Sequence, residues 1–457
     1  MGNLKAGFSR INVTPPLGIG VMGYFKPRLA EKILDDLEIT TLALASGEEK
    51  VLLISFDICL IPEAIVKRFQ KAIVDATGVS EDAVFIHATH THNGPFLERE
   101  DDGFNFLDVN VKENPEEEYC NWVCRKMADA AKMALEDLKP ARMGWGIGHA
   151  PGISFVRRYR MKDGSIRTNP GVNNPEILEP VGTVDERVNV LRFDREGAES
   201  LVLVNFGTHP DTVGGNGITA DWPGFVRRTV EKTIDHTKCI FFNGMQGDVN
   251  HVNVFPTGGF LNDTQVDFDD VSRGYGHARY MGRVVAGGVL QVYDKVKYIE
   301  ADNVRFLSRT IQIPSNMPKA EEMEEAYRID RLHRMGKDEE LPFSGMMLTT
   351  VVADAARKIR LEHGPKFFEM KLYGVAVGDV VIVGIPAEPF TGVGLALKDT
   401  KDWEVVLPMC LVNGSLGYLP MRDAYEEGGY EAADSFFAPG VAEQVIQEGR
   451  ILMEALK

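Results

Sequence analysis

Apolar residues along the chain fall into short runs that alternate with longer amphipathic stretches. Polar residues, Gly or Pro follow the short runs, which are typical of buried strands: Val51–Ile58, Ala83–Ala88, Ser200–Phe206, Lys238–Phe242 and Val380–Ile385. The amphipathic stretches predict helices over Pro62–Ala76, Pro115–Leu138, Phe225–Ile234 and Ala442–Leu456. Strands that alternate with helices predict an α/β fold, with mixed β-sheets layered with helices.

Two stretches depart from this alternation. Pro256–Ser272 is rich in Gly, Asp and Thr and is interpreted as a loop. Pro318–Glu340 is densely charged and is interpreted as a solvent-exposed helix or flap. Because no long linker or internal repeat interrupts the pattern, we expect residues 1–457 to form a single large domain with insertions.

Composition and charge exclude several classes of function. The 457 residues carry 50 basic and 67 acidic side chains, a net charge of −17, which argues against a nucleic-acid partner and a polybasic membrane anchor. No apolar run approaches the roughly 18 residues of a membrane span, so no stable membrane insertion is expected. The first residues lack the apolar core of a signal peptide, which predicts a cytoplasmic protein.

The five cysteines are scattered and do not form a disulfide framework. Cys120 and Cys124 are interpreted as two buried thiols on one helix face rather than as a zinc knuckle. The glycines of 18–23 fit a dinucleotide-binding pattern, but neither a preceding strand nor a following helix is predicted. We expect these glycines to let the backbone approach the wall of a site.

Three of the ten histidines lie within six residues, in the sequence His87-Ala-Thr-His90-Thr-His92-Asn-Gly-Pro. If the preceding strand continues, His90 and His92 point to the same face, because strand side chains repeat every two residues. Two such imidazoles can bind a metal, or one can bind while the other moves protons. The alternative is a polar strand end whose histidines bond to their neighbours.

Other polar residues also follow predicted strands, where open α/β sheets place their ligand sites. His209 follows one strand and can converge with His90, although a lone histidine is usually structural. Glu388 lies between two prolines and is either a metal ligand or a helix cap. Asp57 either orients a ligand histidine or is a buried structural carboxylate. The oxygen donors Asp248 and Asn250 form a weak motif by themselves.

The motifs occur in one order along residues 5–440: Met22-Gly23-Tyr24, Ser55-Phe56-Asp57, Thr89–Pro95, His209-Pro210, Gly247-Asp248-Val249, Pro386-Ala387-Glu388 and Gly417-Tyr418. This ordered set resembles the catalytic domain of the neutral/alkaline, non-lysosomal ceramidase family. The resemblance implies a catalytic Zn²⁺ held by His90, His209, Glu388 and Tyr418. It also implies that His92 lies beside the scissile amide.

The resemblance implies further roles. Arg157, or the adjacent Arg158, together with Tyr430 would stabilise an oxyanion. Asp57, Asn93, Gly94, Asp248 and Asn250 would support the ligands or the substrate. The sequence departs from the family's pattern at Asn93, where better-known members have Ser, and at Asn250-His251, where they have Ser-Pro. We also expect the C-terminal β-sandwich domain of longer members to be absent.

The function expected from this resemblance is hydrolysis of a linear N-acyl amide bond by zinc-activated water, with His92 delivering a proton to the leaving amine. The departures predict a substrate smaller and more polar than ceramide. Two alternatives stay open: a zinc hydrolase of an ester, a lactam or an N-acetyl sugar, and a non-catalytic binding protein with the same fold. The expected partner is a small-molecule or N-acyl substrate, and the sequence leaves the oligomeric state open.

Overall fold

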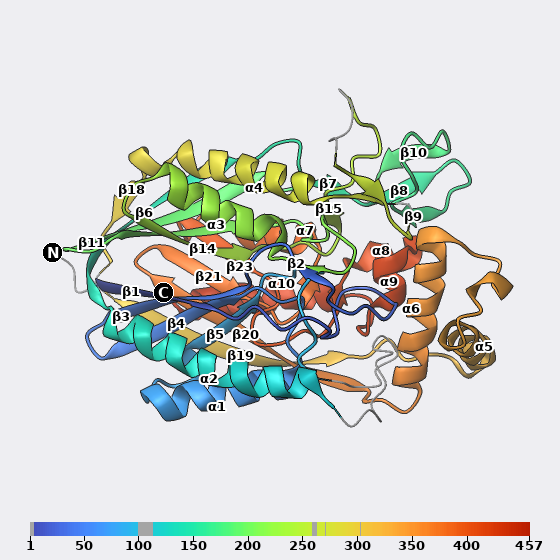
Figure 1. The fold of residues 1–457 in the computed structure, drawn as a ribbon, viewed down its shortest axis with the longest axis horizontal. Coiled ribbons are helices and arrows are strands. Elements are labelled where there is room, and N and C mark those ends of the chain that lie inside the picture. Colours follow the sequence, from blue (N-terminus) through green and yellow to red (C-terminus); the bar gives the residue numbers. More distant parts are fainter. Residues whose placement is uncertain (1–3, 99–112, 258–262, 270, 302) are drawn as a thin grey trace.

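The computed structural model describes residues 4–98, 113–257, 263–269, 271–301 and 303–457. Within them, two β-sheets pack against each other and helices cover both outer sides (Figure 1). Buried side chains of both sheets, among them Leu42, Ile54, Leu372 and Val375, form one continuous apolar core. The predicted α/β class, with helices layered on mixed sheets in a single domain, is confirmed for these residues.

The larger sheet has nine strands among the described residues, in the order β14-β12-β11-β6-β1-β3-β4-β5, with β18 beside β6. The bounds are β1 Leu4–Asn12, β3 Glu38–Ser46, β4 Glu49–Phe56, β5 Val84–Ala88, β6 Lys139–His149, β11 Arg187–Arg195, β12 Ser200–Phe206, β14 Thr237–Asn243 and β18 Lys297–Ile299. Strands β4 and β5 are parallel, as are β12 and β14, whereas the other pairs are antiparallel.

The second sheet has four strands within the described part of the chain, in the order β19-β20-β21-β23. The bounds are β19 Val304–Pro314, β20 Phe367–Val377, β21 Val380–Gly384 and β23 Val405–Met409. In this sheet β21 and β23 are parallel, whereas the pairs β19–β20 and β20–β21 are antiparallel. The strands expected from apolar runs are β4, β5, β12, β14 and β21, with nearly the same bounds.

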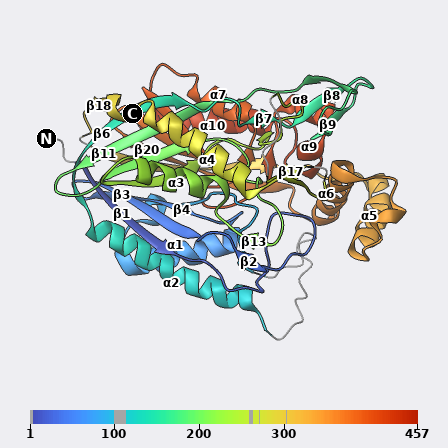
Figure 2. The same ribbon diagram turned by 45° about the horizontal axis from the view of Figure 1, so that its top comes forward.

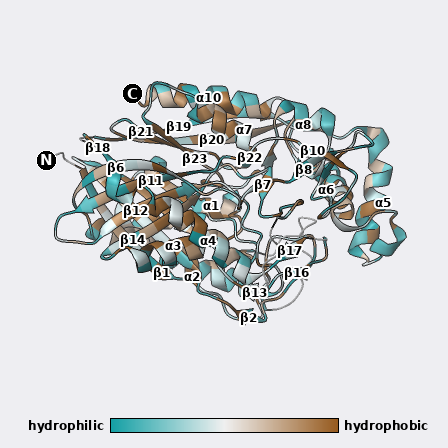
Figure 3. Cartoon of the chain, turned by 90° about the horizontal axis from the view of Figure 1, so that it is seen from above, coloured by the Kyte–Doolittle hydropathy of each residue, from teal (hydrophilic) through white to brown (hydrophobic). Residues whose placement is uncertain are grey.

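Helices cover the sheets on opposite outer sides, as the view from above shows (Figure 3). The bounds are α1 Glu63–Thr77, α2 Pro115–Glu136, α3 Asp221–Thr233, α4 Tyr275–Leu290, α7 Thr391–Lys398 and α10 Val441–Ala455. Helices α2, α3 and α4 pack on the larger sheet, and α7 and α10 pack on the smaller one (Figure 2). Each presents one apolar stripe to the core, as amphipathic helices do. The four predicted helices correspond to α1, α2, α3 and α10.

The charged stretch near residue 330 forms α5 Met323–Arg334, which packs on α6 Gly345–Glu362 at the end of the molecule farthest from the N-terminus (Figure 1). The expected helix is present, but Met323, Ala326 and Ile329 are buried, so one of its faces is not solvated. The short helix α9 Tyr430–Asp434 packs on α6, and α8 Arg422–Glu427 contacts α9 and α10.

Short strands within the loops pair into small separate sheets of two or three strands. Their bounds are β2 Lys32–Ile33, β7 Phe155–Val156, β8 Arg158–Met161, β9 Ile166–Thr168, β10 Ile177–Pro180, β13 Gly217–Ile218, β15 Val249–Asn250, β16 Gln265–Val266, β17 Ser272–Arg273, β22 Glu388–Pro389 and β24 Tyr418–Leu419. The predicted loop 256–272 lies partly outside the described residues, and its last part contains β16.

Each of the five cysteines, all within the described residues, is a free thiol, as predicted. Cys120 is buried on α2, whereas Cys124 is only half-buried, so the expectation of two buried thiols is half right. None of the described helices is both long enough and apolar enough to span a bilayer.

The carboxyl ends of strands from both sheets meet at one end of the sandwich. The backbone N–H of Ala88 donates to Leu411 O over 3.2 Å, and that of Cys410 donates to Asn243 O over 3.2 Å. These cross-links bring the loops after β5, β14 and β23 together. Because the loops at strand carboxyl ends commonly form ligand sites in open α/β sheets, this end is where the polar motifs can converge.

Candidate active site

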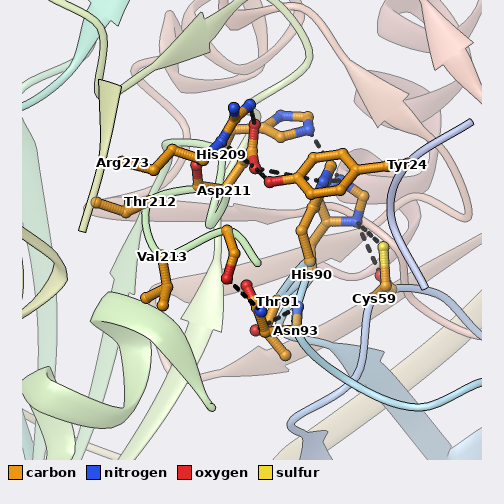
Figure 4. A network of polar contacts seen from close by, with 12 residues as sticks. Tyr24, Cys59, His90, Thr91, Asn93, His209, Asp211, Thr212, Val213 and Arg273 are labelled. Atoms are coloured by element: carbon orange, nitrogen blue, oxygen red, sulfur yellow. Dashed lines mark hydrogen bonds and ion pairs between the residues drawn. The ribbon is translucent and has the colours of Figure 1, made fainter. Parts of the chain in front are cut away.

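His90 and His209 come from loops that follow β5 and β12, and their imidazoles meet between these loops (Figure 4). Their Nε2 atoms are 3.0 Å apart. The Nδ1 of His90 is 2.8 Å from Cys59 O, and the Nδ1 of His209 is 3.3 Å from Gln246 O. A carbonyl oxygen accepts only, so each Nδ1 carries the proton, and in the neutral rings both Nε2 lone pairs face each other.

Glu388 completes the cluster. Its Oε2 lies 3.1 Å from Nε2 of His90 and 3.9 Å from Nε2 of His209. The three residues are buried, and their donor atoms all lie within 4.8 Å of one another. Burial lowers the pKa of His90, but the Glu388 carboxylate raises it more, so it lies well above its usual value. The cluster therefore favours positive charge among its donor atoms.

Tyr418 lies opposite Glu388 in the parallel pair β22–β24. Its ring stacks on that of His209 with the ring centres 6.4 Å apart, and the ring centre of Tyr430 is 5.4 Å away. Burial raises the pKa of both phenols well above the usual value, so both keep their protons at neutral pH. The two tyrosines therefore offer O–H donors beside the histidine cluster.

His92 also reaches the cluster, although not by the expected route. Strand β5 ends at Ala88, and His90 adopts a positive φ of 72°, so the strand does not continue through His92 and the alternation argument is wrong. The turn at His90 instead brings Nε2 of His92 to 3.3 Å from Nε2 of His90. Burial lowers the pKa of His92 well below its usual value, which keeps the ring neutral.

Asp211 is a residue of this site that sequence reasoning missed. Its Oδ1 lies 3.6 Å from Nδ1 of His92 and accepts a hydrogen bond from the Tyr24 hydroxyl (Figure 4). The Arg273 guanidinium donates to both carboxylate oxygens, over 3.0 and 2.6 Å. Burial raises the pKa of Asp211, but Arg273 outweighs this and keeps it well below its usual value. The sequence feature that could have indicated Asp211 is its position two residues after His209.

Of the two adjacent arginines, Arg157 faces the site. Its Nε donates to Glu431 over 2.6 Å, its Nη2 donates to Gly247 O over 2.7 Å, and its guanidinium lies 5.3 Å from the centre of the Tyr418 ring. Arg158 instead donates to Glu427 and to Gly428 O. Glu431, which sequence reasoning did not single out, therefore fixes the orientation of Arg157.

The residues expected to support the ligands lie behind this cluster. The Asp57 carboxylate accepts hydrogen bonds from the Arg227 guanidinium and from the backbone N–H of Glu38, which corresponds to its structural interpretation. Asn93 donates to the carbonyls of Gly214 and Gly217 over 2.9 and 2.8 Å and so shapes a neighbouring loop. Neither side chain contacts a histidine through a hydrogen bond within the described residues.

Three further expected residues form hydrogen bonds with neighbouring loops: Gly94, Asp248 and Asn250. Gly94 O accepts from the backbone N–H of Met22, 3.0 Å away. Asp248 accepts from the backbone and hydroxyl of Thr391, and burial raises its pKa to about 6. The amide of Asn250 donates to Asn169. These three residues position the chain around the site without reaching the histidine cluster.

A cavity of about 450 Å³ opens onto the cluster. His90, His92, Glu388, Tyr418 and Tyr430 line its polar part. Most of the remaining wall is apolar, and prominent members are Phe25, Phe96, Leu97, Leu361, Phe368 and Phe436. The cavity thus joins a cluster of metal-type ligands to a chamber suited to an apolar group.

No family model matches the sequence, and no curated protein matches it. Its structure, however, aligns with the crystal structure of neutral ceramidase from Pseudomonas aeruginosa, with a TM-score of 0.73 and 15% identity, over 100% of this chain and 75% of the other. The chain has the fold of neutral ceramidase. A ceramidase complexed with C2 gives a TM-score of 0.72 at 16% identity, over 100% of this chain and 76% of the other. The ceramidase fold expected from the ordered motifs is thereby confirmed.

Proposed function

We propose that the chain is a zinc-dependent hydrolase that cleaves a linear amide bond in an N-acyl compound. The observation that carries this proposal is the convergence of His90, His209 and Glu388 beside a largely apolar cavity, which His90 and Glu388 line. Two imidazoles and a carboxylate are the ligand types that catalytic zinc sites use. The structural likeness to ceramidases, which are amide hydrolases, supports the same class of reaction.

The donor set fits a divalent cation. Two unprotonated Nε2 atoms 3.0 Å apart repel each other unless a proton or a cation lies between them. Hydrogen bonds from the Nδ1 of a histidine to a carbonyl oxygen, such as those of His90 and His209, orient imidazoles that bind metals. Tyr418 would complete the ligand set. When bound, zinc supplies Lewis acidity that activates water and polarises a carbonyl group.

His92 is placed to move the proton that amide cleavage requires. With its proton on Nδ1, the nitrogen 3.6 Å from Oδ1 of Asp211, the neutral ring would leave Nε2 able to accept a proton from the attacking water. The same Nε2 then gives that proton to the leaving nitrogen. An amine anion is a very poor leaving group, so amide cleavage requires a group that protonates the leaving nitrogen. A binding protein has no need of such a group, so the position of His92 favours an amide hydrolase.

Arg157 and Tyr430 are proposed to stabilise the oxyanion that develops from the carbonyl oxygen. Both are buried, and the Arg157 guanidinium lies 5.8 Å from the centre of the Tyr430 ring. The bond from Arg157 to Glu431 holds the guanidinium in place before substrate arrives, as preorganised electrostatic stabilisation requires.

The cavity favours a substrate with an apolar acyl group. Aromatic and aliphatic side chains form most of its wall, which supports an N-acyl compound more than a sugar derivative. The lining thus does not support the expectation of a smaller and more polar substrate. An ester with the same acyl chain is the remaining alternative, because the same residues would serve its hydrolysis.

Metal analysis and an N-acyl substrate test the proposal together. We expect the purified chain to bind about one zinc ion and to hydrolyse N-octanoyl amides, and a chelator to abolish turnover until zinc is restored. His209→Ala should lose both the metal and the activity, whereas the matched control His149→Ala, at an exposed histidine, should keep both. Zinc-loaded protein that cleaves octanoyl esters but no amide would contradict the proposed bond type.

A further inference from the structure

Asp434 is the last residue of α9, one helical turn beyond Tyr430. Residues four apart on a helix lie on the same face, so Asp434 continues the surface that carries the proposed oxyanion donor. Asp434 lines the same cavity as His90 and Tyr430, but it lies outside the histidine cluster. None of the roles described above uses this carboxyl group.

The carboxyl group of Asp434 is buried without the partner that such a group normally has. The residue is 9% exposed, and its Oδ1 has no hydrogen-bond partner among the described residues. A desolvated carboxyl oxygen that makes no hydrogen bond costs free energy, so the large majority of buried polar groups are paired.

The neighbouring Arg357 does not donate a hydrogen bond to Asp434. The Arg357 guanidinium is directed to Ala433 O, Asn316 O and Asp354. Burial and the negative charge of Glu388 raise the pKa of Asp434 to about 7, against the opposing influence of Arg360 and Arg357. The environment therefore leaves the carboxyl group poorly compensated, in a cavity whose wall is otherwise mostly apolar.

We propose that Asp434 is a specificity-determining residue that accepts a hydrogen bond from an O–H or N–H donor which the substrate carries close to its scissile amide. The proposal rests on the proposed function for the reaction, but the recognition itself needs only the cavity. A site built around a buried acceptor rejects an analogue that lacks the donor, because the acceptor then stays unpaired when the ligand fills the cavity. The preferred substrate class is an N-acyl amide with a hydroxyl or amino substituent near the amide.

Matched pairs of substrates test this preference and locate the donor. The first pair compares N-octanoylethanolamine, which carries a hydroxyl on its amine half, with N-octanoylpropylamine, which has none. The second pair compares N-propyl-2-hydroxyoctanamide, which carries the hydroxyl on its acyl half, with N-propyloctanamide. N-(2-aminoethyl)octanamide supplies an ammonium donor. We expect one hydroxyl-bearing member to be preferred by about 10–100-fold in kcat/KM, the range for a hydrogen bond to a charged group.

Variants then assign the preference to Asp434. Asp434→Leu should reduce the ratio to within about threefold while the donor-free amide is still cleaved. Asp434→Asn, which keeps an acceptor oxygen, should retain the preference for the hydroxyl and lose any preference for the ammonium. Glu426→Gln, at an exposed carboxylate of α8, is the charge-matched control and should behave as the unaltered chain.

Binding separates this proposal from the proposed function. Calorimetry of the same pairs on zinc-loaded His92→Ala protein, with and without Asp434→Leu, reports recognition in the absence of turnover. A donor preference in binding that Asp434→Leu removes supports the proposal even if no amide is hydrolysed, which would refute the function alone. Hydrolysis with no donor preference, or a preference that survives Asp434→Leu, would overturn the role of Asp434 and leave the function intact.

Discussion

The Nδ1 of His92 lies 3.6 Å from the Oδ1 of Asp211, and Arg273 holds that carboxylate from its other side. At this distance the carboxylate favours a proton on Nδ1 of His92 electrostatically, which would leave a lone pair on Nε2. The Tyr24 hydroxyl bonds to the same carboxylate oxygen and limits its movement. His92 therefore lies next to the histidine cluster in a position that suits the proton transfer proposed for it.

His92→Ala should lower kcat by about 10²–10⁴-fold, the usual loss when a general acid–base group is removed. The metal content should stay the same, because His90, His209 and Glu388 supply the proposed ligands without it. Parallel measurement of zinc content and single-turnover rates checks both halves. If the variant loses its zinc, His92 is a ligand and the proton-transfer role is wrong.

Gly23→Ala should lower turnover through His92. A Cβ at position 23 would lie 2.7 Å from Cγ and 2.9 Å from Cα of His92, so the ring must move. We expect a loss of at least about tenfold in kcat, because small displacements of reacting groups have large kinetic effects. Kinetics with zinc analysis measures this loss.

Gly18→Ala is the matched control for that variant. Gly18 also has a positive φ, of 85°, but a Cβ there meets nothing within 4 Å. Both alanines carry the backbone strain of the left-handed region, and only the one at position 23 also meets His92. Equal activity losses in the two variants would attribute the effect to strain rather than to contact with His92.

Much of the fold could be predicted because buried strands such as β4 and β21 are uninterrupted apolar runs. Strand β6 was missed because it has glycine at alternate positions, a composition typical of loops. The structure explains one of these glycines: a Cβ at Gly148 would lie 1.9 Å from the carbonyl oxygen of Gly288 in α4. Helix α4 packs directly on this strand, a tertiary requirement that local propensity does not contain.

Part of the candidate site could be predicted from the positions of its residues relative to the strands. His90, His209 and Glu388 each follow a strand, and the common position of strand ends made their convergence predictable. The partners of these residues come from distant parts of the chain. Asp57, for example, bonds to Arg227, which is 170 residues away, and nothing in the neighbouring sequence indicates that pair.

Asp57→Ala should destabilise the fold and leave the chemistry of the folded protein unchanged. The substitution leaves the Arg227 guanidinium buried without its main partner, which typically costs about 3–5 kcal/mol. Urea unfolding measures the loss, and zinc content and kcat of the folded variant measure the site. A folded Asp57→Ala protein with weakened zinc affinity would instead restore the interpretation that Asp57 supports a ligand histidine.

Asp185 links β11 to α7 and should make stability depend on pH in the acid range. Burial raises the pKa of Asp185, but hydrogen bonds and charges from Arg187 and Lys398 outweigh it and lower the pKa to about 2. A pKa below the unfolded value of 3.8 means that the unfolded chain binds the proton more tightly. The contribution, about 2 kcal/mol, is therefore present above pH 4 and is lost as the pH falls toward 2. Asp185→Asn should lose this stabilisation at pH 7 and should approach the stability of the unaltered chain in acid. The control Glu426→Gln, at an exposed residue, should match the unaltered chain at both pH values. A difference in urea midpoint between Asp185→Asn and the unaltered chain that does not change with pH would refute this linkage.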